Sequence, residues 1–331
     1  MVRFGLLGCG RIGRVHAASL AANPRAELVV AYDPFEASAG EVVAQHGGTA
    51  TTDVRAVLDD DTVDAVVIAS PTPTHVELLT RAVRAGKAVL CEKPIDLDLA
   101  RVDACAAAHD GVDATVLVGF NRRFDPSMRA VRDRVDAGEI GRLEQLTIVS
   151  RDPAPPPVSY VRESGGLFRD MTIHDLDMAR FFLGEVVEVT ASGANLVDPA
   201  IGEVGDIDSA VLLLRGSSGA LATITNSRRC SYGYDQRLEA FGSDGMLSVA
   251  NQRPTSVRYS GTGVTEAADE YLNFFLDRYA TAYAAELDHL LDAMEAGTAP
   301  SPGFADGRAA LVLADAALES LRTGRTVPVR A

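Results

Sequence analysis

Apolar and polar positions follow two different rhythms along this chain. In the first third, short apolar runs alternate with segments whose apolar residues recur at helical spacing. The run Val63–Ala69 is continuously apolar, as expected of a strand buried on both faces of a parallel sheet. The rhythm predicts a doubly wound α/β sheet of Rossmann type. The predicted strands are 2–7, 27–32, 63–69, 88–91 and 114–118, and the predicted helices are one ending near 22, then 37–46, 73–85 and 97–109.

Beyond about residue 122, strand-like runs separated by turn residues replace this alternation. They predict an α+β domain with a largely antiparallel sheet. We therefore expect two domains, 1–122 for the cofactor and 123–331 for substrate binding and oligomerisation, which suits a chain of 331 residues. In the second domain the predicted strands are 142–151, 185–191, 209–215, 220–227, 236–241, 246–249 and 256–259, and the predicted helices are 127–137, part of 165–181, 268–295 and 304–322.

A glycine-rich turn lies between the first predicted strand and the first predicted helix. Gly8, Gly10 and Gly13 form a G-x-G-x-x-G pattern, and Asp33 ends the second strand twenty residues later. In this context the glycines allow a tight turn, close approach of a pyrophosphate, and helix–strand packing. Asp33 can accept hydrogen bonds from the ribose and would repel a 2′-phosphate, so the pattern predicts NAD. A glycine-rich turn without a ligand is the alternative.

Two further strand ends carry polar residues where a doubly wound sheet binds ligands. The strand 63–69 is followed by Ser70, Thr72 and His75, which are candidates for lining the cofactor. His75 can equally be an ordinary early-helix residue. The strand 88–91 is followed by Glu92 and Lys93, and a lysine there would point into the nicotinamide crevice. An ordinary surface lysine is the alternative for Lys93.

The segment 165–181 combines a glycine pair with a helical pattern. Asp170, His174 and Asp177 follow one another at helical spacing and can share a face. A carboxylate one turn from an imidazole can orient the ring for proton transfer. The alternative is an amphipathic helix with a solvated acidic face.

Composition narrows the classes of function. A net charge of −15 argues against nucleic acid and anionic membranes as partners. No apolar run reaches the length of a membrane span. The four cysteines are scattered without a CxxC pair, which favours a cytoplasmic protein and disfavours disulfides or a zinc site. The only lysines are Lys87 and Lys93.

Four segments together resemble the Gfo/Idh/MocA oxidoreductase family. They are Gly8–Gly13, Glu92–Pro94, Gly119–Pro126 and Gly165–Phe181. Within that family the chain is most similar to bacterial inositol 2-dehydrogenases, by the proline-rich stretch that begins at 150–153 and by the run 165–175. The resemblance extends from residue 2 to about 322.

The resemblance implies NAD-dependent oxidation of a cyclic polyol, most simply myo-inositol to 2-keto-myo-inositol, by a homotetramer formed through the open face of the second sheet. It assigns a catalytic trio of Lys93, Asp170 and His174. Its cofactor residues are Gly8, Gly10, Arg11, Ile12, Gly13 and Asp33, to which the strand ends add Ser70, Thr72, His75, Glu92 and Lys93. Its polyol contacts are Arg122, Asp152, Tyr234 and Tyr283, with Tyr232 or Tyr279 as replacements for the tyrosines.

In the expected mechanism His174 takes the hydroxyl proton, Asp170 orders the ring and binds a neighbouring hydroxyl, and Lys93 stabilises the developing alkoxide. Three alternatives stay open. One is a sibling dehydrogenase of scyllo-inositol, another inositol isomer or an aldose. Another is a non-catalytic NAD-dependent sensor, and the third is a metal hydrolase using Asp170, His174 and Asp177 as ligands.

Overall fold

The computed structural model describes residues 1–108 and 114–329, which fall into two compact units. The first unit comprises 1–124 and 281–311, and the second begins at 125, ends at 280 and resumes at 312. The break after Phe124 lies close to the boundary expected at 122. The segment 281–311 differs from expectation, because its contacts assign it to the first unit. The expected helix end at His109 lies outside the described residues.

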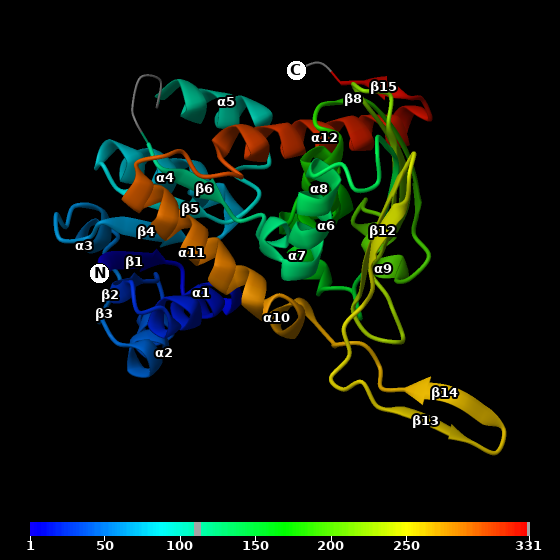
Figure 1. Ribbon diagram of the computed structural model, residues 1–331. Coiled ribbons are helices and arrows are strands. Elements are labelled where there is room, and N and C mark those ends of the chain that lie inside the picture. Colours follow the sequence, from blue (N-terminus) through cyan, green and yellow to red (C-terminus); the bar gives the residue numbers. More distant parts are fainter. Residues whose placement is uncertain (109–113, 330–331) are drawn as a thin grey trace. The chain divides into compact units, whose positions relative to one another are not determined.

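The first unit is built on a six-stranded sheet in the order β3-β2-β1-β4-β5-β6, shown in blue to cyan in Figure 1. Every pairing in it is parallel, which confirms the predicted Rossmann arrangement. Its elements are β1 (Val2–Leu7), α1 (Arg11–Ala22), β2 (Ala26–Tyr32), α2 (Glu36–His46), β3 (Thr49–Thr51), α3 (Arg55–Leu58), β4 (Ala65–Ile68), η1 (Thr72–Thr74), α4 (His75–Arg84), β5 (Ala88–Cys91), α5 (Leu99–Ala108), β6 (Val116–Val118), η2 (Asn121–Phe124) and nearly all of α11 (Ala280–Ala296).

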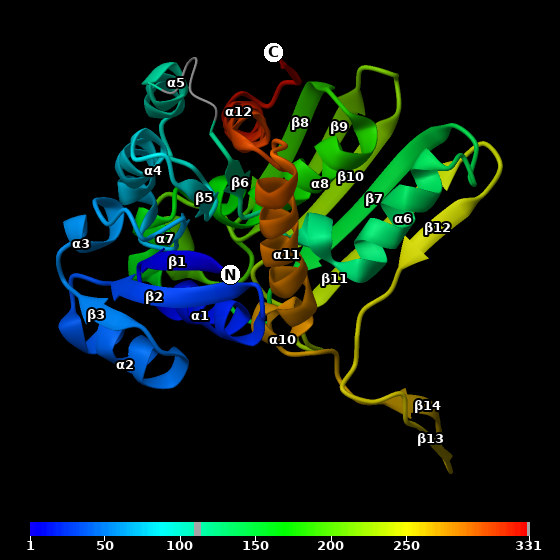
Figure 2. The same cartoon turned by 60° about the vertical axis from the view of Figure 1, so that its left-hand side comes forward.

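The second unit contains a seven-stranded sheet in the order β12-β11-β7-β10-β9-β8-β15, and Figure 2 labels all of these strands except β15. Only β7 and β10 pair in parallel, so the prediction of a largely antiparallel sheet is confirmed. Its elements are α6 (Pro126–Asp136), β7 (Leu143–Arg151), α7 (Val158–Glu163), η3 (Phe168–Thr172), α8 (Ile173–Leu183), β8 (Val186–Ala194), α9 (Pro199–Glu203), β9 (Ser209–Gly216), β10 (Leu221–Ser227), β11 (Asp235–Gly242), β12 (Met246–Val249), β13 (Arg258–Gly261), β14 (Val264–Ala268), α10 (Phe275–Arg278), the greater part of α12 (Phe304–Thr323) and β15 (Val327–Pro328).

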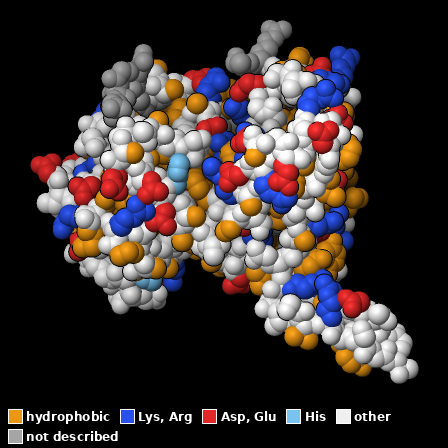
Figure 3. Space-filling view, in the orientation of Figure 1, with side chains coloured by type: hydrophobic (Ala, Val, Ile, Leu, Met, Phe, Trp, Pro, Cys, Tyr) orange, Lys and Arg blue, Asp and Glu red, His pale blue; other side chains and the backbone are white. Residues whose placement is uncertain are grey.

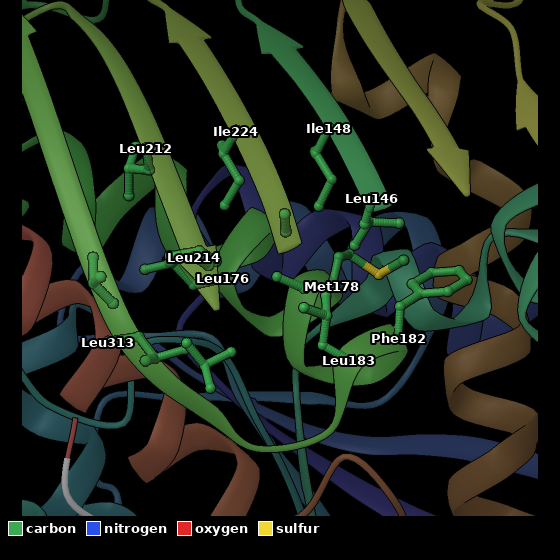
Figure 4. Close-up of a cluster of buried hydrophobic side chains, with 14 of the residues drawn as sticks. Leu146, Ile148, Leu176, Met178, Phe182, Leu183, Leu212, Leu214, Ile224 and Leu313 are labelled. Atoms are coloured by element: carbon green, nitrogen blue, oxygen red, sulfur yellow. The ribbon is translucent and has the colours of Figure 1, made fainter. Parts of the chain in front are cut away.

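Helix α8 packs on one face of this sheet. Alternate strand residues such as Leu146, Ile148 and Ile224 point toward Leu176 and Met178 of the helix (Figure 4). These side chains are nearly inaccessible to solvent. The apolar packing fixes the position of the helix that carries the predicted base.

The chain between 256 and 280 departs from the prediction. The expected strand 256–259 is β13, which pairs only with β14 in a hairpin outside the main sheet. The predicted helix 268–295 is wrong in its first turns, because Ala268 ends a strand and helix begins only at Phe275. None of the helices in the described ranges is long and apolar enough to cross a membrane.

Candidate active site

The glycine turn between β1 and α1 has the shape of a dinucleotide cradle. Gly8 adopts φ +103°, and a Cβ on it would lie 2.5 Å from the Ser70 nitrogen. A Cβ on Gly13 would collide with the Gly8 carbonyl oxygen. Around Gly10, by contrast, no described atom outside Gly10 and its two chain neighbours lies within 4 Å of that position, so the backbone is open to a ligand. The cradle therefore fits a pyrophosphate at the α1 N-terminus, where Arg11 is exposed and Ile12 half-buried.

Asp33 follows β2 and faces this turn. Its Oδ2 accepts a hydrogen bond from the Cys9 amide at 2.9 Å, and its Oδ1 accepts one from the Phe35 amide at 2.9 Å. These bonds fix the carboxylate while each oxygen keeps a lone pair that a ribose hydroxyl can use. The first turn of α1 contains no acidic residue, so the anion-binding end of the helix is not opposed by its own charge.

The loop after β4 holds the next three candidates. The Ser70 hydroxyl lies 2.6 Å from that of Thr74, and Thr72 begins η1. The ring of His75 turns inward and is only 1% exposed. Its Nδ1 lies 2.8 Å from the Pro94 carbonyl oxygen and its Nε2 lies 2.8 Å from that of Ser70. His75 therefore contacts backbone carbonyls on both sides.

The turn after β5 carries Lys93, which is half-buried. Glu92 beside it is buried, and its Oε1 lies 2.8 Å from His16 Nε2 on α1. The other carboxylate oxygen accepts from the Lys93 amide at 3.3 Å. The two carboxylate oxygens of Glu92 thus contact protein groups, and one of them helps to fix the backbone at Lys93.

Helix α11 packs against the same residues. Tyr283 meets the His16 ring edge-on with centroids 5.5 Å apart. One turn further, Glu286 is fully buried, and neither of its carboxylate oxygens has a hydrogen-bond partner within the described part of the chain. Burial, together with the nearby charge of Glu92, raises the pKa of Glu286 well above its usual range.

In the second unit, Asp170 lies in a π-helical turn, η3, directly before α8. Its Oδ2 accepts two hydrogen bonds of 3.1 Å from the Arg228 guanidinium, and its Oδ1 accepts one of 2.9 Å from the Tyr160 hydroxyl. The Arg228 side chain is 1% exposed and that of Asp170 is 13% exposed, so the ion pair is partly buried. His174 lies in the first turn of α8 and is half-buried.

The acidic residues that follow His174 are not solvated. Asp175 and Asp177 are at most 1% exposed. Asp175 accepts a hydrogen bond of 2.7 Å from the Asn226 amide, whose oxygen accepts one of 2.7 Å from the Thr172 hydroxyl. The interpretation of this segment as a solvated acidic face is therefore wrong. No group of three potential metal ligands lies together in the described ranges, so the metal-hydrolase alternative gains no support.

The candidate polyol contacts are distributed over both units. Asp152 follows β7, and Tyr234 is buried with its ring edge-on to Tyr279, centroids 6.1 Å apart. The Tyr232 hydroxyl donates to Asp235 at 2.9 Å, and its ring is exposed. Arg122, in η2, belongs to the first unit together with Tyr283, Lys93 and the cofactor candidates, whereas Asp152, Tyr234, Asp170 and His174 belong to the second.

Sequence reasoning missed Arg228, Tyr160 and Asn226, which hold the Asp170–Asp175 segment. Their partners are 58, 10 and 51 residues away, and no local pattern connects them. It also missed His16, for which a signal existed. His16 shares the buried side of α1 with Gly13, Ala17 and Leu20, and a polar residue in that position needs a polar partner.

The fold and these sites define a class of oxidoreductase. Residues 2–120 match the NAD-binding Rossmann-fold domain of the oxidoreductase family, and residues 128–248 match the GFO/IDH/MocA C-terminal domain. The chain belongs to the Gfo/Idh/MocA family of NAD-dependent oxidoreductases, as the motifs predicted.

Individual relatives cover nearly the whole chain. The inositol 2-dehydrogenase of Rhizobium meliloti (strain 1021) is 50% identical over 329 residues, 99% of each chain. The crystal structure of a myo-inositol dehydrogenase from Corynebacterium glutamicum ATCC 13032 superposes with a TM-score of 0.97 at 55% identity, covering 100% of this chain and 99% of that one. The scyllo-inositol dehydrogenase from Lactobacillus casei, with bound NAD(H) and scyllo-inositol, gives a TM-score of 0.92 at 28% identity, covering 100% of both.

Proposed function

We propose that this protein oxidises one secondary alcohol of a cyclic polyol, with myo-inositol as substrate and 2-keto-myo-inositol as product. The reaction removes a hydroxyl proton and a hydride from the same carbon. NAD, when bound, accepts the hydride. The observation that carries the proposal is the full-length likeness, at half identity or more, to proteins named inositol dehydrogenases.

The catalytic trio is part of the proposal. His174 takes the hydroxyl proton, and Lys93 stabilises the negative charge that develops on the oxygen. Asp170 is already oriented by Arg228 and Tyr160, and its remaining lone pairs can accept from a neighbouring hydroxyl of the ring. The expected role of Asp170 in ordering the His174 ring also stays part of the proposal.

Gly8, Gly10, Gly13 and Asp33 are the residues proposed to hold the cofactor, since the open backbone at Gly10 and the fixed carboxylate of Asp33 fit its pyrophosphate and ribose. We propose Asp152, Tyr234, Arg122 and Tyr283 as polyol contacts. A ring with many hydroxyls suits such a set of carboxylate, phenol and guanidinium groups.

A spectrophotometric panel tests the proposal. The purified protein is supplied with NAD or NADP and, in turn, with myo-inositol, scyllo-inositol, chiro-inositol and glucose. We expect the fastest reduction of NAD with myo-inositol. A clear preference for scyllo-inositol or glucose would make the protein a sibling dehydrogenase. If NAD binds calorimetrically but no polyol reduces it, the sensor alternative replaces the proposal.

A homotetramer formed through the outer face of the seven-stranded sheet also belongs to the proposal. Val211, Leu213, Phe241 and Met246 point away from the core on this face and are 44–55% exposed. Phe241 and Met246 are direct cross-strand partners on β11 and β12. Adjacent exposed apolar side chains on a sheet favour burial against another subunit.

We also propose that the protein acts in the cytoplasm. All four cysteines lie in the described ranges and are buried thiols with no disulfide, as a reducing compartment favours. Fractionation of the producing cells should recover the dehydrogenase activity with the cytoplasmic fraction, and recovery with membranes would contradict the assignment.

A further inference from the structure

The two strand-end turns of the first unit that hold Ser70 and Lys93 are joined by one side chain. β4 and β5 are neighbouring parallel strands, so the turns that follow them emerge side by side at the carboxyl edge of the sheet. His75 begins α4 and places its ring between these turns. Its two nitrogens each lie 2.8 Å from a backbone carbonyl oxygen, one on Ser70 and one on Pro94.

Neither carbonyl carries a hydrogen, so both bonds must come from the ring. A neutral imidazole has one N–H, and only the protonated ring donates to both acceptors. The pKa of His75 is lowered from its usual range, because burial outweighs the two carbonyls and the carboxylates of Glu92 and Asp96, which act in the opposite direction. Asp96 is itself paired with Arg101 at 2.9 Å. In either protonation state His75 donates to at least one of the two turns.

An ordinary core residue would not be placed in this way. His75 is 1% exposed, and an apolar side chain could fill the same volume without a polar partner. Replacing the ring with an apolar group would remove the N–H donor, leaving at least one of the two carbonyls at this edge of the sheet without it. The contacts of the His75 ring indicate that the backbone of the turns after β4 and β5 is held in a fixed position.

We propose that His75 is a positioning residue for Lys93, holding the turn that carries this lysine at a fixed distance from the turn after β4. The inference rests on the proposed catalytic role of Lys93. His16 and Glu92 also hold the same turn, since Glu92 contacts both the His16 ring and the Lys93 amide. His75 therefore acts on turnover through Lys93 and not by touching cofactor or polyol.

The composition of the chain supplies a direct probe. Lys87 and Lys93 are the only lysines, so protein labelled with 15N-lysine shows two backbone amide signals. Lys87 is an internal reference, because its amide donates to Ala82 and its ammonium donates to the carbonyls of Asp60 and Val63. The Lys93 signal reports the turn whether or not any substrate is turned over.

The experiment compares His75→Leu and His75→Gln with the control His46→Gln, which lies in the last turn of α2. We expect His75→Leu to displace the Lys93 signal, leave the Lys87 signal in place and lower kcat for myo-inositol by about 10–100-fold, the scale of a small misplacement of a reacting group. In His75→Gln the glutamine amide can donate to one carbonyl, so the displacement of the Lys93 signal and the loss of kcat should both be smaller. The dissociation constant for NAD should stay within about threefold, because the glycine turn and Asp33 are untouched.

An unmoved Lys93 signal in His75→Leu, or a defect confined to NAD affinity, would overturn the proposal. If His75→Leu does not fold, His75→Gln decides alone: a displaced Lys93 signal with lowered kcat supports the proposal, and an unchanged signal refutes it. Failure of the proposed function looks different, because wild-type protein would then reduce no NAD with any polyol while the lysine spectra still report on His75.

Discussion

At the scale of single residues, the ion pair of Asp170 and Arg228 governs how the proposed site is held. Breaking this pair would leave the guanidinium of Arg228, which is 1% exposed, without the Asp170 carboxylate that compensates its charge. Arg228 donates to Asp170 from two nitrogens of one guanidinium, so it fixes the direction of the carboxylate as well as its charge. Asp170 can then meet a polyol hydroxyl without reorganising.

His174→Ala should lower kcat for myo-inositol by ~10²–10⁴-fold, the usual contribution of a positioned acid–base group. NAD binding should survive, because the residues proposed to hold the cofactor belong to the other unit. Steady-state kinetics and calorimetric NAD titration check both points, with His46→Ala as the control. A variant that keeps near-normal turnover would remove His174 from the proposed mechanism.

The double variant Asp33→Ser, Pro34→Arg should narrow the preference of the enzyme for NAD over NADP. In the wild type, a 2′-phosphate would meet the Asp33 carboxylate, which is held in place by the Cys9 and Phe35 amides. Removing this charge and adding a guanidinium reverses the local electrostatics. The ratio of kcat/KM values for the two cofactors is the measurement. A wild type that already favours NADP would show that Asp33 does not contact the ribose.

Site residues could be predicted from local sequence only where the residues that act together lie in one continuous segment of the chain. Gly8, Gly13 and Asp33 could be predicted because strand, turn and helix follow one another without interruption. Arg228 could not, since its approach to Asp170 depends on where β10 ends relative to η3. The burial of Asp175 was missed for the same reason, because Asn226, also near the end of β10, satisfies its carboxylate.

At the scale of elements, α11 shows what periodicity leaves undetermined. The apolar spacing of 280–296 predicts a helix, but it does not say which sheet the helix covers. In the structure α11 belongs to the first unit and brings Tyr283 and Glu286 beside the His16–Glu92 pair. The start of the helix was misplaced because residues 264–268 form a strand of the β13–β14 hairpin, a pairing with no turn signal strong enough to predict.

Glu286→Gln should stabilise the protein increasingly as pH rises. The pKa of Glu286 is raised in the folded state, whereas in the unfolded chain it is about 4.3. At pH values between the unfolded-state pKa and the folded-state pKa, the folded protein therefore binds one more proton than the unfolded chain. The free energy of unfolding of the wild type falls as pH rises through that window. Glutamine carries no such dependence. Urea unfolding at pH 5 and pH 8 should show a larger advantage for the variant at pH 8.

Glu295→Gln, at the exposed end of the same helix, is the matched control and should show little change between the two pH values. If the advantage of Glu286→Gln were the same at both, the carboxyl would have to be paired or hydrated in the folded protein.

At the scale of the whole molecule, the net charge bears on ligand binding, whereas the exposed apolar side chains bear on the proposed assembly. The chain carries a net charge of −15, and acidic and basic side chains are interspersed on the face seen in Figure 3. A neutral polyol is indifferent to this charge. For the anionic cofactor, the proposed contact is the helix N-terminus at Gly10, where the first turn of α1 contains no acidic residue.

Leu213→Arg should dissociate the proposed tetramer. Leu213 lies on the outer face of β9 and is 45% exposed, so a charge there would be desolvated on assembly. Light scattering during size exclusion measures the change in mass. Leu196→Arg is the control, since Leu196 is 70% exposed and lies in the loop after β8. A wild type that runs as a monomer, or an unchanged mass in the variant, would count against the sheet as the interface.

The central claim is that a hydride passes from one ring carbon of myo-inositol to NAD, and isotope transfer tests it most directly. The protein is supplied with NAD and with myo-inositol that carries deuterium at the carbon bearing the hydroxyl to be oxidised. We expect one deuterium in each NADH formed, recovered by mass spectrometry, and a turnover slower than with unlabelled substrate whenever hydride transfer limits the rate. NADH without deuterium, or deuterium kept in the oxidised product, would contradict the account.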